Sequence, residues 1–324
     1  MSFTKRISLI FPLLMGSISS ASVEANSPHV DLNTEIGRGY FAVSLNLASE
    51  FQNESPEAWH LASWNLSFGG SQSKFKNSSE SNQVQLQRSV DASLGLDLSY
   101  DEFFSLESVV YGSATQETRF RQVGFELRPL FYTASGPFEP SEFEGSSVDD
   151  KKRRYLRGGA GVGLAQVTQN FDLPPAQHPN GTKSDTRFQM HQNFSEITLG
   201  ATPVSFFSVD MTMQLYSYSK ERSEVQALEY NPAYNFSGID LTTSMSELPE
   251  SSGEVILTLH PSLTWELSLR GKNSKLFWDE SIAREFSITW TQYQETSNWG
   301  LGFTQYESFG TTENTVSLSL GVDL

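Results

Sequence analysis

The side chains of this chain that could carry out chemistry are few and far apart. The sequence has five histidines and no cysteine, so thiol nucleophiles, disulfides and cysteine-bound metals are excluded. His178-Pro179-Asn180-Gly181 combines His with Asn, but it lacks a serine nucleophile, and its Pro and Gly residues are typical of a turn. Residues 191–195, His-Gln-Asn-Phe-Ser, have suitable residue types without a spacing that brings a base to a nucleophile. We therefore predict no catalytic residue.

Metal and cofactor chemistry has no better support. His260 and Glu266 are expected on one polar face of a single strand, roughly 20 Å apart, too far to share a metal or a proton. The other histidines show no ligand spacing, and Asp149-Asp150 does not match a calcium loop. The glycines of residues 158–163 resemble a phosphate loop only superficially, because no helix follows them. The sequence predicts no metal site and no cofactor.

The elements that must position these residues alternate with a period of two. From Val316 to Leu324 every even position is aliphatic, and the positions between them are Ser, Gly or Asp. Side chains alternate faces along a strand, so each such segment has one apolar and one polar face. No convincing helical stripe follows the first 25 residues. The sequence therefore predicts an all-β chain.

Thirteen segments are candidate strands, and several exceed the length of an ordinary globular strand. They are Phe41–Leu47, Ala62–Phe68, Val90–Tyr100, Phe104–Gly112, Val123–Leu127, Leu156–Val167, Phe194–Ala201, Val209–Tyr216, Gly238–Glu247, Glu254–Arg270, Phe286–Thr291, Trp299–Thr304 and Val316–Leu324. Tight turns at 100–103, 201–203 and 294–298 contrast with long polar stretches at 69–82, 131–153, 168–187, 219–235 and 271–283. The alternation of long and short connections is imperfect, because two long stretches flank one strand at 156–167.

The beginning of the chain reads as a secretory signal peptide. Lys5 and Arg6 precede a short apolar core at residues 7–15, and small residues allow cleavage after Ala21 or Ala25. The net charge of −16 argues against nucleic acid and anionic bilayer surfaces as partners. An exported chain without cysteine fits a bacterial envelope better than a disulfide-stapled secreted scaffold.

Alternating strands fit either a soluble β-sandwich or barrel, with the apolar side inward, or a membrane barrel, with that side toward lipid. Three features favour the membrane barrel. Many strands have the length that spans a bilayer. The polar faces are rich in Gly, Ser, Thr, Gln and charge, as a water-filled interior requires. Aromatic residues gather toward strand ends, as in interfacial girdles: Phe68, Tyr100, Phe103, Phe104, Phe131, Tyr132, Tyr218, Phe277, Trp278, Trp299 and Tyr306.

With its signal peptide, acidity and in-phase last strand, the chain resembles Gram-negative outer-membrane β-barrel proteins, either porin-like or of the solitary autotransporter type. That resemblance implies a transmembrane antiparallel up-and-down barrel. Single-chain barrels have an even strand number, so we expect about 12 strands, with 10 or 14 open, and Phe41–Leu47 as a strand or a plug segment. The expected boundaries are 1–25 for the signal peptide, 26–37 for a short periplasmic or plug segment, and 38–324 for the barrel.

In this group the last strand is recognised by the barrel-assembly machinery, as alternating hydrophobic residues that most often end on Phe. The residues matching that assembly signal are Val316, Leu318, Leu320, Val322 and Leu324, so the chain departs from the pattern by ending on Leu. The chain also resembles outer-membrane phospholipases in length. Their motif, His two residues before Ser and then Asn-Gly, is not matched at His178, which leaves a lipid-modifying enzyme as the least supported alternative.

The polar faces carry the charges that would line the interior of the barrel. The predicted pore-lining residues are Asp91, Asp97, Glu126, Arg128, Arg157, Asp210, Glu254, Glu266, Arg270 and Glu285. Acidic linings favour cations, so the leading hypothesis is a passive, weakly cation-preferring pore for small solutes. The alternative is a non-conducting barrel with an adhesion or structural role through its loops. Small residues at Gly159, Gly161, Gly163 and Ala165 are expected to make room inside.

The expected partners follow from the location in the outer membrane. They are outer-membrane lipid and lipopolysaccharide, with the assembly machinery during insertion, no nucleic acid, and an oligomeric state left open. Lys151, Lys152, Arg153 and Arg154 could contact lipopolysaccharide phosphates, since Lys and Arg are the usual partners of phosphate. The favoured interpretation is a solvated charge run beside Asp149 and Asp150.

Overall fold

Long antiparallel strands make up nearly all of the described structure. The computed structural model describes residues 24–25, 28–52, 59–76, 84–100, 104–115, 120–132, 156–172, 185–204, 206–224, 248–262, 264–277, 279–294, 296–308 and 311–324. The strands are β1 (Glu24–Ala25), β2 (His29–Gly37), β3 (Tyr40–Gln52), β4 (His60–Lys76), β5 (Val84–Tyr100), β6 (Phe104–Thr115), β7 (Phe120–Tyr132), β8 (Leu156–Asp172), β9 (Asp185–Val204), β10 (Phe207–Tyr218), β11 (Pro249–Ser262), β12 (Trp265–Leu276), β13 (Ile282–Tyr293), β14 (Ser297–Ser308) and β15 (Thr311–Asp323).

The sheet closes on itself into a barrel. Each strand from β2 to β15 pairs antiparallel with its neighbours in sequence, and β15 also pairs with β2 along Thr315–Asp323. The short β1 pairs only with the end of β3 and lies outside the ring. Closure removes the unpaired strand edges, which a bilayer does not tolerate. The predicted all-β closed barrel is confirmed, but with 14 strands rather than about 12.

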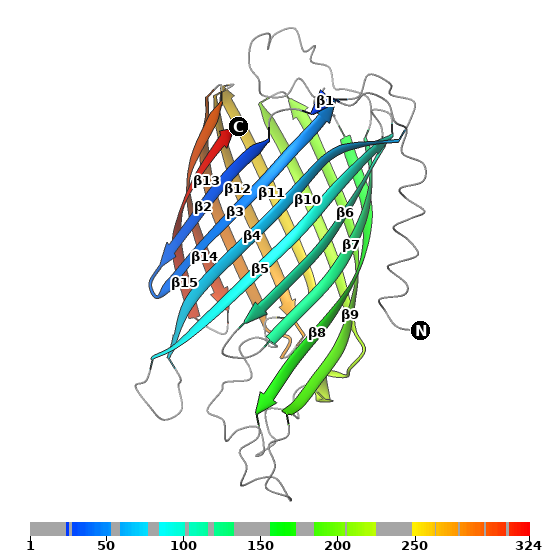
Figure 1. Ribbon diagram of the computed structural model, residues 1–324, viewed down its shortest axis with the longest axis vertical. Coiled ribbons are helices and arrows are strands. Elements are labelled where there is room, and N and C mark those ends of the chain that lie inside the picture. Colours follow the sequence, from blue (N-terminus) through cyan, green and yellow to red (C-terminus); the bar gives the residue numbers. More distant parts are fainter. Residues whose placement is uncertain are drawn as a thin grey trace, which may run out of the picture.

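The antiparallel order fixes two ends of the barrel. One end of the barrel, at the top of Figure 1, is where β2 begins at His29 and β15 ends at Asp323, and we call it the terminal end. We call the opposite end the loop end. The loop end carries the connections at residues 77–83, 173–184 and 219–248, and β8 and β9 project beyond it (Figure 1). The terminal end is where β5 is followed by β6, β9 by β10 and β13 by β14 after only two or three residues. The longer interval between β7 and β8 falls at the same end. That placement explains the broken alternation of loop lengths.

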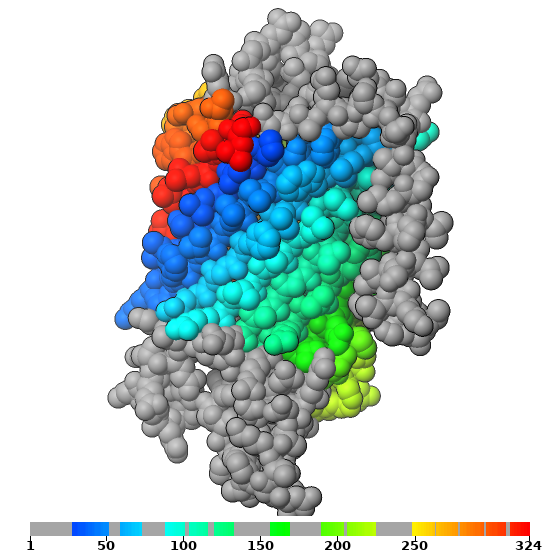
Figure 2. All heavy atoms as spheres, viewed as in Figure 1, coloured from blue at the N-terminus to red at the C-terminus, as the bar shows by residue number. Residues whose placement is uncertain are grey.

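The period-two pattern turns apolar side chains outward and polar ones inward. Even positions of β15 face out, where Val316, Leu318 and Leu320 are each about half exposed. Even positions of β8 and odd positions of β9 face out in the same manner. Val162 and Ile197, both 60% exposed, exemplify the outer face, whereas Gln192 and Glu196 are buried inside. Figure 2 shows the wall from one side as a continuous surface of closely packed strands. A soluble barrel would have the reverse distribution.

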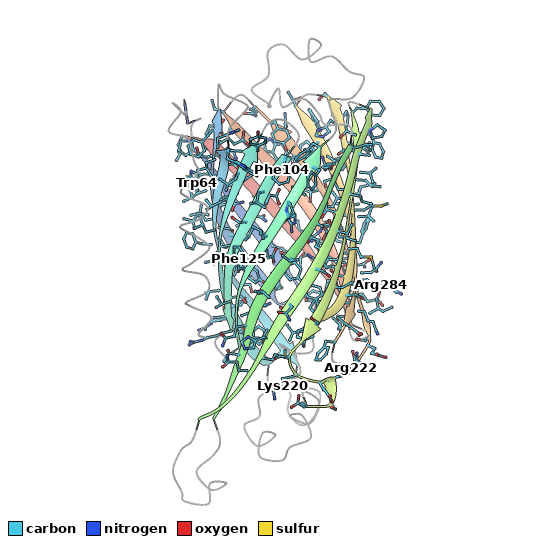
Figure 3. All side chains as sticks on the ribbon, turned by 90° about the vertical axis from the view of Figure 1, so that its right-hand side faces the viewer. Trp64, Phe104, Phe125, Lys220, Arg222 and Arg284 are labelled. Atoms are coloured by element: carbon cyan, nitrogen blue, oxygen red, sulfur yellow. The ribbon has the colours of Figure 1, made fainter. Side chains whose placement is uncertain are left out.

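Aromatic residues mark the terminal end of the outer face. Phe104 packs on Phe131 at 4.9 Å between ring centroids, and Trp290 packs on Trp265 at 4.7 Å and on Trp299 at 4.4 Å. Figure 3 shows Trp64 and Phe104 at this end, with Arg284 nearer the loop end. Such a girdle marks a membrane interface. Tyr132, Tyr218 and Tyr306, predicted in the same group, have the inward phase, and Phe103 and Trp278 lie outside the described residues.

Two differences from the sequence expectation account for the strand number. Residues 29–37 form β2, a full member of the barrel, rather than a periplasmic or plug segment, and Phe41–Leu47 belongs to the strand β3. Residues 254–270 belong to two antiparallel strands, because β11 ends at Ser262 and β12 begins at Trp265. Two residues separate these strands, so odd positions face out on both of them and the alternation is unbroken. The candidate strand at 238–247 lies outside the described residues.

The connection between β2 and β3 shows how local chemistry sets the register. Arg38 and Gly39 form a two-residue turn, and Gly39 has a φ of 92°, a conformation that only glycine adopts without strain. Residues 1–23 are not described, so signal cleavage stays a prediction.

Among the described residues, no helix is long and apolar enough to span a membrane.

Candidate functional site

The ten predicted pore-lining residues all have the inward phase of their strands. Their registers place Asp91, Asp97, Glu126 and Arg128 on one part of the wall, Arg157 and Asp210 next to it, and the remaining four on β11 to β13. Several of them contact side chains two strands away on the inner face. Such contacts are possible there because the inner face is concave, so side chains converge, whereas they diverge on the outer face. The interior of the barrel is therefore the candidate site, and its chemistry is carried by carboxylates.

The largest cluster surrounds Arg128 on β7. Its Nη1 donates to Glu107 Oε2 at 2.9 Å, its Nη2 lies 3.2 Å from Glu196 Oε2, and its Nε also donates to Glu196. Glu126 is more distant, with its Oε2 at 3.7 Å from Nη2. The Glu196 side chain is only 1% exposed and also accepts from Gln214 Nε2 at 2.6 Å. Three carboxylates share one guanidinium, so this part of the wall keeps a net negative charge.

Two further arginines are held by carboxylates that lie one or two strands away in the sheet. Arg157 Nε donates to Asp210 Oδ1 at 2.5 Å, with a second bond between Nη2 and Oδ2. Arg270 Nη2 lies 2.7 Å from Glu254 Oε2, and its Nη1 lies 3.0 Å from Glu285 Oε1. These contacts run across the lumen wall and fix the orientation of the guanidinium groups. Each arginine is therefore matched or outnumbered by the carboxylates that surround it.

The antiparallel pairing of β11 with β12 corrects one distance expected from the sequence. His260 Nδ1 lies 3.8 Å from Glu266 Oε2, not roughly 20 Å, because the two residues are on adjacent antiparallel strands. Tyr293 also donates its hydroxyl to Glu266 at 3.2 Å. Within the described ranges, no group of three or more His, Asp and Glu side chains has a geometry that could hold a metal.

A histidine cluster joins the first and last strands of the barrel. His29 Nδ1 lies 2.6 Å from Asp323 Oδ1, and its Nε2 lies 2.9 Å from Asp31 Oδ1 and 3.2 Å from Asn298 Nδ2. Gly321 lies beneath these side chains, where any Cβ would collide with them. The cluster ties β2, β14 and β15 together at the terminal end.

Glycines on the inner wall make room for long side chains of adjacent strands. The Tyr111 ring covers Gly124, the Phe194 ring covers Gly163, and the Arg157 and Asp210 side chains cover Gly200. Gly159 and Gly161 lie against Leu130 and Glu196. The small residues predicted to make room for an interior segment or a wider pore are thus covered by wall side chains. The absence of a side chain at each glycine therefore determines where the neighbouring rings and charged groups lie.

Sequence reasoning missed four residues that belong to these clusters: Glu107, Glu196, His29 and Asp31. The sequence did not reveal which face of β9 carries Glu196, because Phe194 is apolar in one phase of the strand and Ile197 is apolar in the other. Glu107 alternates with the apolar outer residues of β6 and could have been found from its phase. The basic run Lys151–Arg154 lies outside the described residues, and the strands that it connects, β7 and β8, reach it at the terminal end.

A closed ring of long antiparallel strands, apolar outside and charged inside, defines this chain as an outer-membrane β-barrel protein. No protein-family model matches the sequence, and no curated protein sequence matches it.

Solved structures of outer-membrane channels are similar in fold. Omp33 of Acinetobacter baumannii is 8% identical, with 93% of this chain and 99% of that chain covered and a TM-score of 0.44. The KdgM porin in complex with disordered oligogalacturonate is 7% identical, with 91% and 99% covered and a TM-score of 0.40. OpdK of Pseudomonas aeruginosa with vanillate is 10% identical, with 95% and 100% covered and a TM-score of 0.37. These likenesses concern the fold alone, so no solute is transferred to this chain.

Proposed function

We propose that this protein is a passive pore for small solutes with a weak preference for cations. The observation that carries the proposal is the excess of carboxylates on the inner wall. The acids with the inward phase on the described strands include Asp31, Glu35, Glu50, Asp91, Asp97, Glu107, Glu126, Glu196, Asp210, Glu254, Glu266, Glu285, Glu313 and Asp323, against the bases Arg128, Arg157, Arg270 and Lys272. An acidic lining raises the local concentration of cations.

Planar bilayers test this proposal directly. The purified protein should give stepwise conductance, and a KCl gradient should give a reversal potential on the cation-selective side. Asp91→Asn, on the inner wall, should lower the permeability ratio of K⁺ to Cl⁻. The matched control is Glu307→Gln, because Glu307 lies on the outer face opposite Arg284. A barrel that inserts without conducting would contradict the pore, and anion preference would contradict the role given to the carboxylates.

The non-conducting barrel remains the second candidate, and one observation favours it. An apolar cluster of Phe120, Val167, Met190 and Leu248 lies at the loop end, with Tyr218 and Phe277 packed on it. Leu248 precedes β11, and its carbonyl accepts from the Phe277 amide at 2.8 Å. Val167 and Met190 have the inward phase of β8 and β9, so their side chains occupy space inside that end of the barrel. The same conductance measurement separates the two candidates.

The proposal includes no enzymatic activity. His191, Asn193 and Ser195 all point outward on β9, and neighbours two positions apart on a strand are roughly 6.6 Å apart along its axis. A base must come within about 3 Å of the proton that it removes. The motif at His178 lies outside the described residues. Purified protein should therefore release no fatty acid from phospholipid vesicles, and sustained release would contradict this part of the proposal.

The outer face also supports contact with lipid phosphates, at the loop end. Arg88, Arg121 and Arg284 have the outward phase of β5, β7 and β13, and all three are exposed, with the Arg284 side chain at 62%. Guanidinium groups pair well with phosphate, so we propose that they bind lipopolysaccharide phosphates and that the loop end faces the outside of the cell. Replacing all three by Gln should lower the lipopolysaccharide that copurifies. An unchanged amount would contradict this assignment, and the variant Lys272→Gln, inside the barrel, is the control.

A further inference from the structure

A cavity lies on the inner wall between β6, β7, β9, β10 and the start of β11. Its volume is 350 Å³, within the range of pockets that hold small organic ligands. Its wall combines aromatic rings, amides and one carboxylate: Tyr111, Phe120, Gln122, Glu126, Gln192, Phe194, Tyr216, Leu248 and Pro249. The ion-pair clusters described above do not explain why so many rings gather here.

Glycines of adjacent strands leave room on the wall for two of these rings. The Tyr111 ring lies over Gly124 and the Phe194 ring over Gly163, in the space that a Cβ would occupy. Phe194 also contacts Tyr216, with ring centroids 5.5 Å apart and an angle of 41° between the planes. The Tyr111, Phe194 and Tyr216 rings therefore lie next to one another on the wall of the cavity. Ring faces carry the negative end of the aromatic quadrupole.

The amides of the cavity are already bonded to protein partners. Gln122 Nε2 donates to Gln192 Oε1 at 2.8 Å, and Gln192 Nε2 donates to the Tyr218 hydroxyl at 3.0 Å. The Tyr216 hydroxyl donates to Gln214 Oε1 at 2.6 Å. These bonds hold the amide groups and the Tyr216 hydroxyl in fixed positions on the cavity wall.

Glu126 is the carboxylate of the cavity, and its counter-ion is not in close contact with it. The cation beside it, Arg128, lies 3.7 Å away and makes shorter contacts with Glu107 and Glu196. The Glu126 carboxylate lines the same cavity as the Tyr111, Phe194 and Tyr216 rings. A carboxylate and several aromatic rings around one space attract the same kind of ligand, a cation with an apolar surface.

We propose that this cavity binds a small organic cation of the alkylammonium class, with Glu126 as its counter-ion. The faces of Tyr111, Phe194 and Tyr216 would contact the methyl or methylene groups of the ligand. The inference deepens the proposed pore, because the ligand reaches the cavity through the lumen, but binding itself requires no conduction. Inorganic cations lack the apolar surface, so they gain less from the rings.

Binding is measured on the full-length folded barrel in detergent by isothermal titration. Choline is the probe, and 3,3-dimethylbutan-1-ol, which has the same shape without the charge, is the matched ligand. We expect saturable choline binding at least tenfold tighter than binding of the alcohol. Glu126→Gln and Tyr216→Leu should each weaken choline binding about tenfold, the order of magnitude of one desolvated cation–π contact. Tyr216→Phe keeps the ring and should bind choline like the unchanged protein.

A second cavity supplies the control variant. Its 390 Å³ are lined by Glu35 and Asp91 with a single ring, Tyr40, so Glu35→Gln removes a carboxylate without touching the aromatic site. That variant should leave choline binding unchanged, and heat-modifiable gel migration should show every variant folded. Equal binding of the alcohol or of glucose, or unchanged affinity in both Glu126→Gln and Tyr216→Leu, would overturn the proposal. A barrel that binds choline without conducting contradicts only the pore, whereas one that conducts without binding choline contradicts only this site.

Discussion

Removing the guanidinium of Arg128 should destabilise the barrel more than removing that of any other lumen arginine. In Arg128→Met, Glu196 loses both of its bonds to the guanidinium while its side chain stays 1% exposed. It keeps the hydrogen bonds from Gln214 at 2.6 Å and from Thr198 at 3.1 Å, which are neutral donors. The variant therefore leaves a buried carboxylate without a counter-ion.

The magnitude follows from burial. Breaking a buried ion pair by removing one partner costs about 3–5 kcal/mol, and the two remaining donors place Arg128→Met near the low end, at about 3 kcal/mol. Arg270 is the matched control, because it also bridges two carboxylates but is itself 38% exposed. Solvated pairs of this kind contribute about 1 kcal/mol or less. We therefore expect the two methionine variants to differ by about 2 kcal/mol in free energy of unfolding.

Urea titration of the protein in lipid vesicles, followed by tryptophan fluorescence and gel migration, measures both variants. The double variant Arg128→Met with Glu196→Gln should recover a large part of the loss, because the uncompensated charge is gone. Equal losses for Arg128→Met and Arg270→Met would refute the argument from burial. No recovery in the double variant would show that packing, rather than charge, sets the cost.

Three further predictions concern other parts of the structure. Gly163→Val should displace the Phe194 ring and destabilise folding by about 1–3 kcal/mol, as overpacking does, in the same urea titration; an unchanged midpoint would contradict the close approach. Leu324→Asp should block assembly and Leu324→Phe should not, measured as folded protein in the outer-membrane fraction; normal levels of the Asp variant would contradict the assembly signal. The pKa of Glu280 lies below its ordinary value, because Arg222 donates to it at 2.6 Å, so this pairing stabilises the fold above the ordinary pKa of glutamate and is lost as pH falls through the lowered one. Carbon NMR of labelled Arg222→Gln protein should show the Glu280 midpoint shifted upward, and an unshifted midpoint would contradict the pairing.

Much of the architecture could be predicted from period two alone. Alternation assigned a lipid-facing and a lumen-facing phase to the strands, and the ten predicted lumen charges all have the inward phase in the structure. The strand prediction failed where the alternation of apolar and polar residues continued unchanged across the connection between two strands. Two residues separate β11 from β12, which leaves the parity unchanged, so the two strands read as one. β2 was missed for a different reason: its outward phase contains Thr34, and its inward phase carries His29, Asp31 and Glu35.

The candidate ligand site depends on neighbours that the sequence does not reveal. Tyr111 belongs to β6 and Gly124 to β7, and only the register between those strands places the ring over the glycine. Phe194 and Gly163 meet through the register of β8 and β9 in the same way. Neither pair has a spacing along the chain that marks it, because register is set by the sum of many cross-strand contacts.

The sequence by itself determined which side of every recognised strand faces lipid and which charges face inward, because side chains alternate strictly along an extended chain. It also determined the acidic character of the interior. The tertiary structure alone decided the number of strands, the pairing of β2 with β15, and the partners of each interior charge. Those features depend on how separate strands are aligned, and one carboxylate looks like another until register brings Arg128 beside Glu196 and leaves Glu126 facing the rings.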